Sequence, residues 1–101
     1  MDIGVSGLRR EFVHELDISA VRGRDGGVGL EFFRPQGSGA VRVCGFGPFG
    51  VHSGLRIDDW IYQIAGRDVC KMTMLEITAS LRGQPRSRVK LKIRRAVADL
   101  L

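Results

Sequence analysis

Residues 23–34 read GRDGGVGLEFFR, and this stretch decides the fold that the chain can adopt. Its first seven residues include four glycines, which predict a loop whose backbone takes positive φ angles or is approached closely by another group. The next five residues, 30–34, contain one leucine and two phenylalanines and are typical of a short strand. We therefore expect a tight glycine loop that opens directly into a strand.

Four more strands are expected around this stretch. Residues 12–22 fit an opening strand, and residues 40–44 follow the strand at 30–34 as the second half of a hairpin. Residues 57–64, IDDWIYQI, are rich in residues that favour strands, and Gly66 turns the chain after them. Residues 88–95, RVKLKIRR, alternate strictly between apolar and basic side chains and predict a half-buried strand.

A helix over about 73–82 separates the last two strands. Thr73 and Glu76 have the spacing of a capping box, in which each side chain bonds the backbone of the other residue. An apolar stripe follows at helical spacing, and Gly83 and Pro85 stop the helix. The stripe consists of Met74, Ile77, Thr78 and Leu81.

The segment GFGPFG at residues 45–50 matches the GxGxxG fingerprint of dinucleotide-binding sites. That fingerprint requires a helix to open at its third glycine, but no amphipathic repeat appears before Gly54. We interpret the segment as a glycine-rich connection whose Phe46 and Phe49 lie on the core.

The length and composition predict one domain. The chain has 101 residues, of which 44% are hydrophobic and 27% charged, so it is long enough for one buried core and short for two. We expect a flexible N-terminal tail at 1–11, a domain over 12–95 and a C-terminal tail at 96–101. No apolar run reaches the roughly 18 residues of a membrane span, and the first ten residues lack the apolar core of a secretory signal.

Charge and cysteine content limit the classes of function. Residues 82–95 hold seven basic and no acidic side chains, whereas the rest of the chain holds nine bases and eleven acids. This basic strip either binds an anionic surface or is the solvated face of a strand. Cys44 and Cys70 have no metal-ligand spacing and are expected to be free thiols. No constellation of catalytic residues is recognisable, so we expect no enzyme activity, cofactor or metal.

Four features in sequence order make the chain resemble a PDZ domain with the non-permuted, animal-type order of elements. They are Gly27-Val28-Gly29-Leu30, Ser53-Gly54-Leu55-Arg56, Asp59-Trp60-Ile61 and Ile64-Ala65-Gly66, followed by the helix from Thr73. The resemblance covers about residues 17–95. Two positions depart from the family pattern, because Asp58 stands in place of the usual glycine and Ala65 in place of the usual asparagine.

The resemblance implies an α+β fold: a small, mostly antiparallel, five- to six-stranded β-sandwich or partly open barrel, capped by one main helix and one short helical turn. It also implies a protein-interaction module, an adaptor or scaffold in signalling, that binds the C-terminal peptide of a partner by strand addition. The peptide would lie between the strand at 30–34 and the helix at 73–82. Expected partners are the tails of membrane receptors or signalling proteins, in the cytoplasm or at a membrane through those partners.

By similarity to the family, the backbone amides of Val28, Gly29 and Leu30 hold the terminal carboxylate. The main chain of Leu30, Phe32 and Arg34 then pairs with the peptide. Arg22 and Arg24, before the loop, either assist the carboxylate through water or are solvated loop charges. The side-chain pockets are lined by Val28, Leu30, Phe32, Met74, Thr78 and Leu81.

Met74 indicates the preferred type of tail. The commonest PDZ subclass has histidine at this helical site, where it bonds a Ser or Thr hydroxyl two residues before the ligand's end. The thioether of methionine is a weak acceptor on an apolar side chain. We therefore expect a Φ-x-Φ tail, with an apolar residue at that position and at the end.

Two other interactions stay open. Phosphoinositide or anionic-surface binding is the alternative function, with an anion patch at Arg88, Lys90, Lys92 and Arg94. Nucleic acid is not expected as a partner, because residues 82–95 contain no aromatic side chain for stacking. The chain ends in Leu101 with a free carboxylate, so weak head-to-tail self-association is also expected.

Overall fold

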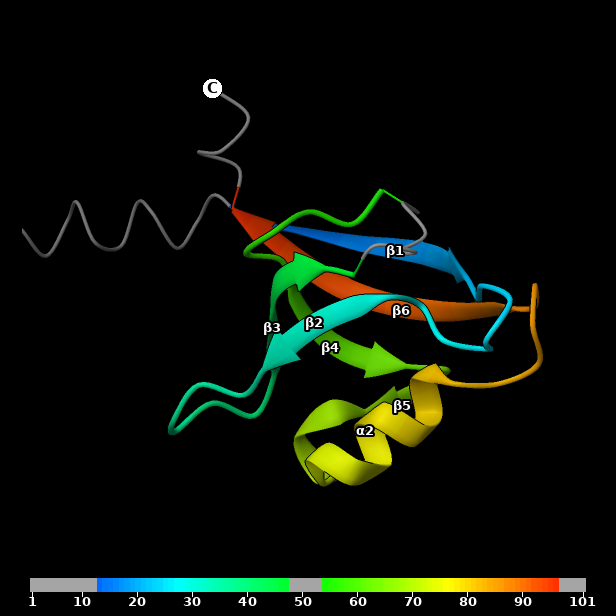
Figure 1. The fold of residues 1–101 in the computed structure, drawn as a ribbon. Coiled ribbons are helices and arrows are strands. Elements are labelled where there is room, and N and C mark those ends of the chain that lie inside the picture. The colour runs from blue at the N-terminus through cyan, green and yellow to red at the C-terminus, as the bar shows by residue number, and fades with distance from the viewer. Residues whose placement is uncertain (1–12, 48–53, 97–101) are drawn as a thin grey trace, which may run out of the picture.

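A computed structural model describes residues 13–47 and 54–96. Phe12, Phe49, Leu101 and the predicted tail at 1–11 lie outside this part of the chain. The elements, shown in Figure 1, are β1 (Val13–Val21), β2 (Leu30–Phe33), β3 (Val41–Phe46), β4 (Trp60–Ile64), β5 (Arg67–Asp68), the 3-10 turn η1 (Val69–Lys71), α2 (Met74–Leu81) and β6 (Arg88–Ala96).

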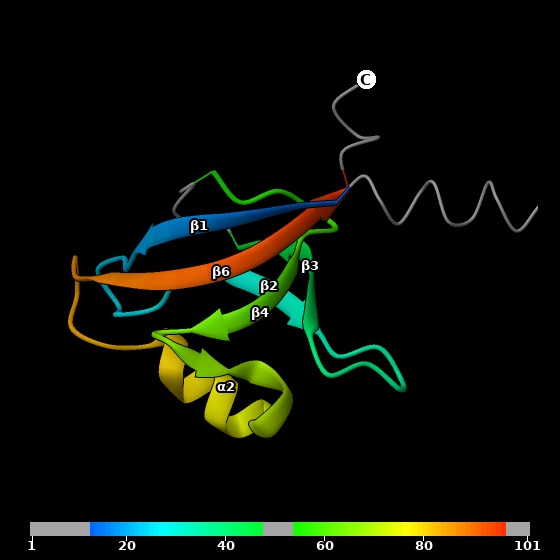
Figure 2. The same ribbon diagram turned by 180° about the vertical axis from the view of Figure 1, so that it is seen from behind.

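The strands form one sheet with the order β1-β6-β4-β3-β2, and β5 pairs with β4. Every strand pair is antiparallel. Figures 1 and 2 show α2 close to β4 and β5, with β1 at the far side of the sheet. The expected fold, an antiparallel sheet with one main helix and one short helical turn, is confirmed.

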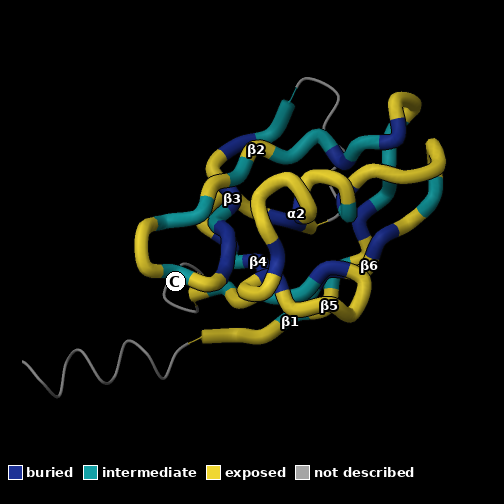
Figure 3. The backbone as a smooth tube through the Cα atoms, turned by 90° about the horizontal axis from the view of Figure 1, so that it is seen from below, coloured by how far each residue is buried: buried dark blue, intermediate teal, exposed yellow. Residues whose placement is uncertain are grey.

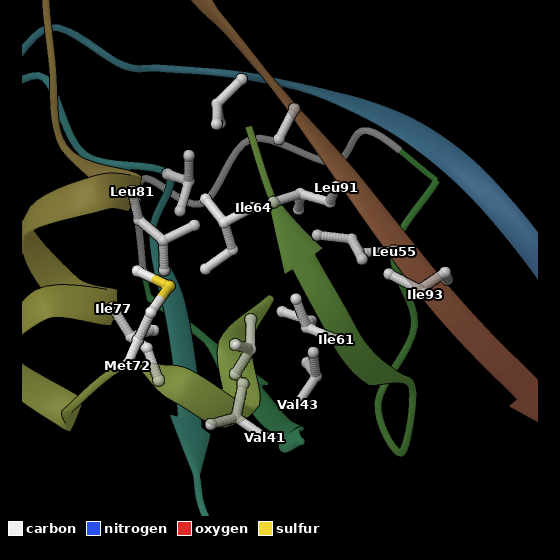
Figure 4. Close-up of a cluster of buried hydrophobic side chains, with 14 residues drawn as sticks. Val41, Val43, Leu55, Ile61, Ile64, Met72, Ile77, Leu81, Leu91 and Ile93 are labelled. Carbon is white, nitrogen blue, oxygen red and sulfur yellow. The ribbon is translucent and has the colours of Figure 1, made fainter. Parts of the chain in front are cut away.

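The core lies between the sheet and α2, as Figure 4 shows. Strand β6 contributes Val89, Leu91 and Ile93, which are buried in the strict alternation that the sequence predicts. The apolar stripe of α2 is only partly buried: Ile77 is fully buried, whereas Met74 is 38% exposed. Figure 3 shows the consequence: most residues of α2 are exposed, and the buried ones are Ile77 and Leu81.

Two strand boundaries differ from the expectation by more than one residue. Strand β4 begins at Trp60 and not at Ile57, because Asp58 adopts a φ of 76° and turns the chain there. Ile57 is consequently 55% exposed. Strand β3 continues to Phe46, so the glycine-rich connection begins at Gly47. Phe46 packs against the core as expected.

A buried ion pair lies at the end of β6 and joins it to the segment directly before β4. The Arg95 guanidinium donates to both carboxylate oxygens of Asp59, at 2.9 and 2.8 Å, and to the Gly54 carbonyl at 2.7 Å. The Asp59 side chain is 1% exposed and that of Arg95 12%. The hydrogen bonds that Arg95 donates to the Asp59 carboxylate raise the pKa of Arg95 above its ordinary value.

Among the described residues, no helix has the length and apolar character that crossing a bilayer requires.

Candidate functional site

The glycine loop at 23–29 is held in place from two sides. Within the loop, Gly23 N–H donates to the Gly27 carbonyl at 2.7 Å, and Gly27 N–H donates to Asp25 Oδ1 at 3.0 Å. From outside, Gly83 N–H donates to the Gly26 carbonyl at 2.9 Å, and a side chain at Gly26 would collide with the Gly83 carbonyl oxygen. The loop is therefore fixed against the segment that follows α2.

The end of this loop presents backbone donors without partners. Val28 and Gly29 donate no backbone N–H hydrogen bond to any described residue, although the Gly29 carbonyl accepts from Gly47 N–H at 2.8 Å. Gly29 has a φ of 67°, a conformation that glycine adopts without strain. Adjacent free N–H groups at such a bend are suited to an anionic oxygen.

Strand β2 is the edge of the sheet, because within the described residues it pairs only with β3. Hydrogen bonding in an antiparallel pair alternates along the strand. Since Gly29 bonds toward β3, the main-chain groups of Leu30 and Phe32 point to the open edge. Two of the three positions expected to pair with a peptide, Leu30 and Phe32, lie in β2, whereas Arg34 follows its end.

Strand β2 and helix α2 are joined near both ends. Near the start of α2, Arg34 Nη2 donates to the carbonyls of Val69 at 2.8 Å and Met72 at 2.9 Å. Near its end, the Gly26–Gly83 bond provides the second connection. Between these ties, no hydrogen bond joins β2 to α2 in the described part of the chain. The helix is anchored beside the strand without being bonded to its edge.

The expected pocket residues fall into two groups. Val28 and Leu81 are 5% and 3% exposed and belong to the core, and Leu30 and Phe32 pack partly buried against it. Met74 and Thr78 are exposed on α2, and the Thr78 hydroxyl donates to the Met74 carbonyl at 3.0 Å. The first group is therefore both core and potential pocket wall, whereas the second is open to solvent.

Two arginines have structural roles that the sequence did not reveal. Arg22 donates to the carbonyls of Ser80 at 3.2 Å and Leu81 at 3.0 Å, and so satisfies carbonyls at the C-terminal end of α2. It is neither a solvated loop charge nor directed to the loop amides. Arg82 instead reaches the loop, where Nη2 donates to the Asp25 carbonyl at 3.3 Å. Arg24 is exposed. These contacts span more than 50 residues of sequence, so no local pattern signals them.

The basic residues of β6 do not form an unopposed patch. Arg88, Lys90 and Arg94 are exposed and Lys92 is half-buried. Strand β1 places Asp17 opposite Lys92 and Glu15 opposite Arg94. Glu15 pairs with Arg94 at 3.3 Å, and the Arg94 guanidinium also lies 4.2 Å from the centre of the Tyr62 ring. The acids of β1 thus offset part of the positive charge.

Comparison with known proteins gives two matches, and both are to PDZ domains. The described residues match the crystal structure of Dlg1 PDZ2 from the choanoflagellate Monosiga brevicollis with a TM-score of 0.63, at 22% identity, over 79% of this chain and 97% of that one. The chain therefore has the PDZ fold. A sequence model described as "PDZ domain" matches residues 50–95, and together the two matches support a PDZ domain. No curated protein matches the sequence.

PDZ domains are protein-interaction modules, and the two matches support that functional class for this chain.

Proposed function

We propose that the domain binds the C-terminal tail of a partner protein along the open edge of β2, with the terminal carboxylate at the amides of Val28 and Gly29. The observation that carries this proposal is a pair of N–H groups that donate to no described residue, directly before a strand edge that no described strand covers. An extended peptide at that edge would satisfy the outward groups of Leu30 and Phe32. Its last side chain would contact Val28, Leu30, Phe32 and Leu81.

The test is an affinity screen of random C-terminal peptides, with amidated copies as controls. Amidation removes the charge, and a hydrogen bond to a charged group contributes about 1.5–3 kcal/mol. We expect amidation to weaken binding by about tenfold or more. Equal binding of the free and amidated forms would overturn the proposal.

The preference for a Φ-x-Φ tail rests on Met74. Its exposed side chain stands at the first position of α2 and presents an apolar surface. The Thr78 hydroxyl already donates within the helix, so it can still accept a hydrogen bond. An apolar residue third from the ligand's end therefore suits this part of the helix best.

Met74→His tests this preference. The imidazole adds a hydrogen-bonding partner for a Ser or Thr hydroxyl third from the end, and we expect the affinity ratio of hydroxyl to apolar peptides to rise about two- to tenfold. Leu75→His is the matched control, because Leu75 is the next residue and is 81% exposed. An unmodified domain that already prefers Ser or Thr would contradict the assignment.

Phosphoinositide or anionic-surface binding by Arg88, Lys90, Lys92 and Arg94 is the second candidate, with less support because Glu15 and Asp17 lie opposite two of these cations. Sedimentation with phosphoinositide-containing vesicles distinguishes it from peptide binding, since phosphate contacts weaken strongly with salt. We also propose a cytoplasmic location, for which the free thiols of Cys44 and Cys70 give support. Self-association through Leu101 stays a prediction.

A further inference from the structure

The face of β2 that points away from the core carries an acid and an aromatic residue. Exposure alternates along the strand: Leu30 and Phe32 are partly buried, whereas Glu31 and Phe33 are exposed. Phe33 is 45% exposed. Because side chains of a strand alternate between two faces, Glu31 and Phe33 share the outer face beside the open edge.

Among the residues that the structure describes, none forms an ion pair with the Glu31 carboxylate. Its cross-strand neighbour is Gly45, where an added Cβ would lie 2.5 Å from Glu31 Oε1. The carboxylate therefore lies over a position that carries no side chain. No ion pair joins Glu31 to a described residue, and the cation opposite Phe33 is already engaged. That cation, Arg42, pairs with Asp58 at 3.4 Å and lies 5.1 Å from the centre of the Trp60 ring.

The direction of the bound peptide places one of its residues opposite this acid. If the carboxylate lies at Val28 and Gly29, the peptide runs antiparallel to β2, and its last side chain faces the core with Leu30. The penultimate side chain then points to the outer face, next to Glu31. This step rests on the proposed function.

We propose that Glu31 selects a lysine or arginine at the penultimate position of the partner's tail. Opposite charges directly across an antiparallel pair attract, and like charges repel. The side chains are exposed, so the effect is modest and sensitive to salt. It acts on the outer face, independently of the apolar contacts at the last and third-from-last residues.

The experiment uses three peptides that differ only at the penultimate residue, which is Lys, Gln or Glu, on a tail with apolar last and third-from-last residues. Fluorescence anisotropy at low salt should give an affinity about two- to fivefold higher for Lys than for Gln, and lower again for Glu. The differences should shrink at high salt. Glu31→Gln should abolish the order, and Glu31→Lys should reverse it.

Asp17→Lys is the matched control, because it changes the net charge equally on β1, at the opposite edge of the sheet from β2. This variant should keep the order Lys, Gln, Glu. Equal affinities for the three peptides in the unmodified domain, or loss of the order in Asp17→Lys, would overturn the inference while peptide binding itself stands. If none of the three peptides binds, both the inference and the proposed function fail.

Discussion

Ala65 occupies a backbone conformation that alanine rarely adopts. Its φ is 51°, and Gly66 follows with 81°, so both residues of the turn between β4 and β5 are left-handed. A Cβ in that region costs about 1–2 kcal/mol, which glycine avoids and asparagine reduces. The usual asparagine of the family at this position thus has a physical reason, and its absence here leaves strain in the turn.

Ala65→Asn should therefore stabilise the domain by about 0.5–1 kcal/mol. The backbone bond from Ala65 N–H to the Lys90 carbonyl, 2.8 Å, is retained. Chemical denaturation measures the change. Ala79→Asn is the control, because Ala79 is exposed on α2 and asparagine there lowers helix propensity. Stabilisation by both variants, or by neither, would refute the strain at Ala65.

Loss of the Asp59–Arg95 ion pair should have the largest effect on stability of any single substitution predicted for this domain. Arg95→Met leaves the buried Asp59 carboxylate without its cation, which should cost about 3–5 kcal/mol in the free energy of unfolding. Arg94→Met is the neighbouring control: its pair with Glu15 is about half exposed, so the loss should be about 1 kcal/mol or less. Similar losses in the two variants would show that the burial of Asp59 carries no special weight.

At the scale of the element, α2 depends on its first turn. Thr73 Oγ1 accepts from Glu76 N–H at 3.1 Å, and Glu76 Oε1 accepts from Thr73 N–H at 2.8 Å. The bond from Thr73 N–H lowers the pKa of Glu76. The stabilisation of the folded state by the Glu76 carboxylate is therefore complete above the ordinary carboxyl pKa. It is lost as the pH falls through the lower pKa of the folded state.

Thr73→Ala should destabilise the domain by about 1 kcal/mol at neutral pH, since one helix N–H loses its acceptor. Glu76→Gln should reduce the dependence of stability on pH in the acid range, because the amide does not titrate. Thermal unfolding at neutral and acid pH measures both. If Glu76→Gln lost as much stability between neutral and acid pH as the unmodified domain, the role of this carboxylate would be contradicted.

The elements that could be predicted from the sequence are those with a regular repeat of apolar residues. Helix α2 and strand β6 repeat their apolar residues at 3.6 and 2 positions, and both appear where these periods indicate. The predicted start of β4 was wrong because Asp58, which replaces the glycine usual in the family, adopts a positive φ that is uncommon for a residue with a side chain. Strand β5, with two residues, is shorter than any periodic signal.

At the scale of the whole molecule, the arrangement of the candidate site depends on contacts between distant segments. The sequence predicted the glycine loop, the following strand and the helix, and the resemblance to a PDZ domain placed them side by side. It did not predict the ties from Arg34 to Val69 and Met72 or from Gly83 to Gly26, which fix α2 beside β2. Those ties join backbone carbonyls, which every residue carries, so composition gives no signal for them.

The central claim is that the amides of Val28 and Gly29, which donate to no residue in the described part of the chain, receive a partner's terminal carboxylate. Residue-resolved NMR of the ¹⁵N-labelled domain, titrated with one apolar-ended peptide in free-acid and amidated forms, tests it most directly. We predict that the free acid shifts the amide signals of Val28 and Gly29 strongly downfield, and that the amidated peptide leaves them nearly unchanged. Signals that stay fixed at Val28 and Gly29 while the free-acid peptide binds elsewhere, for example along β6, would contradict the account.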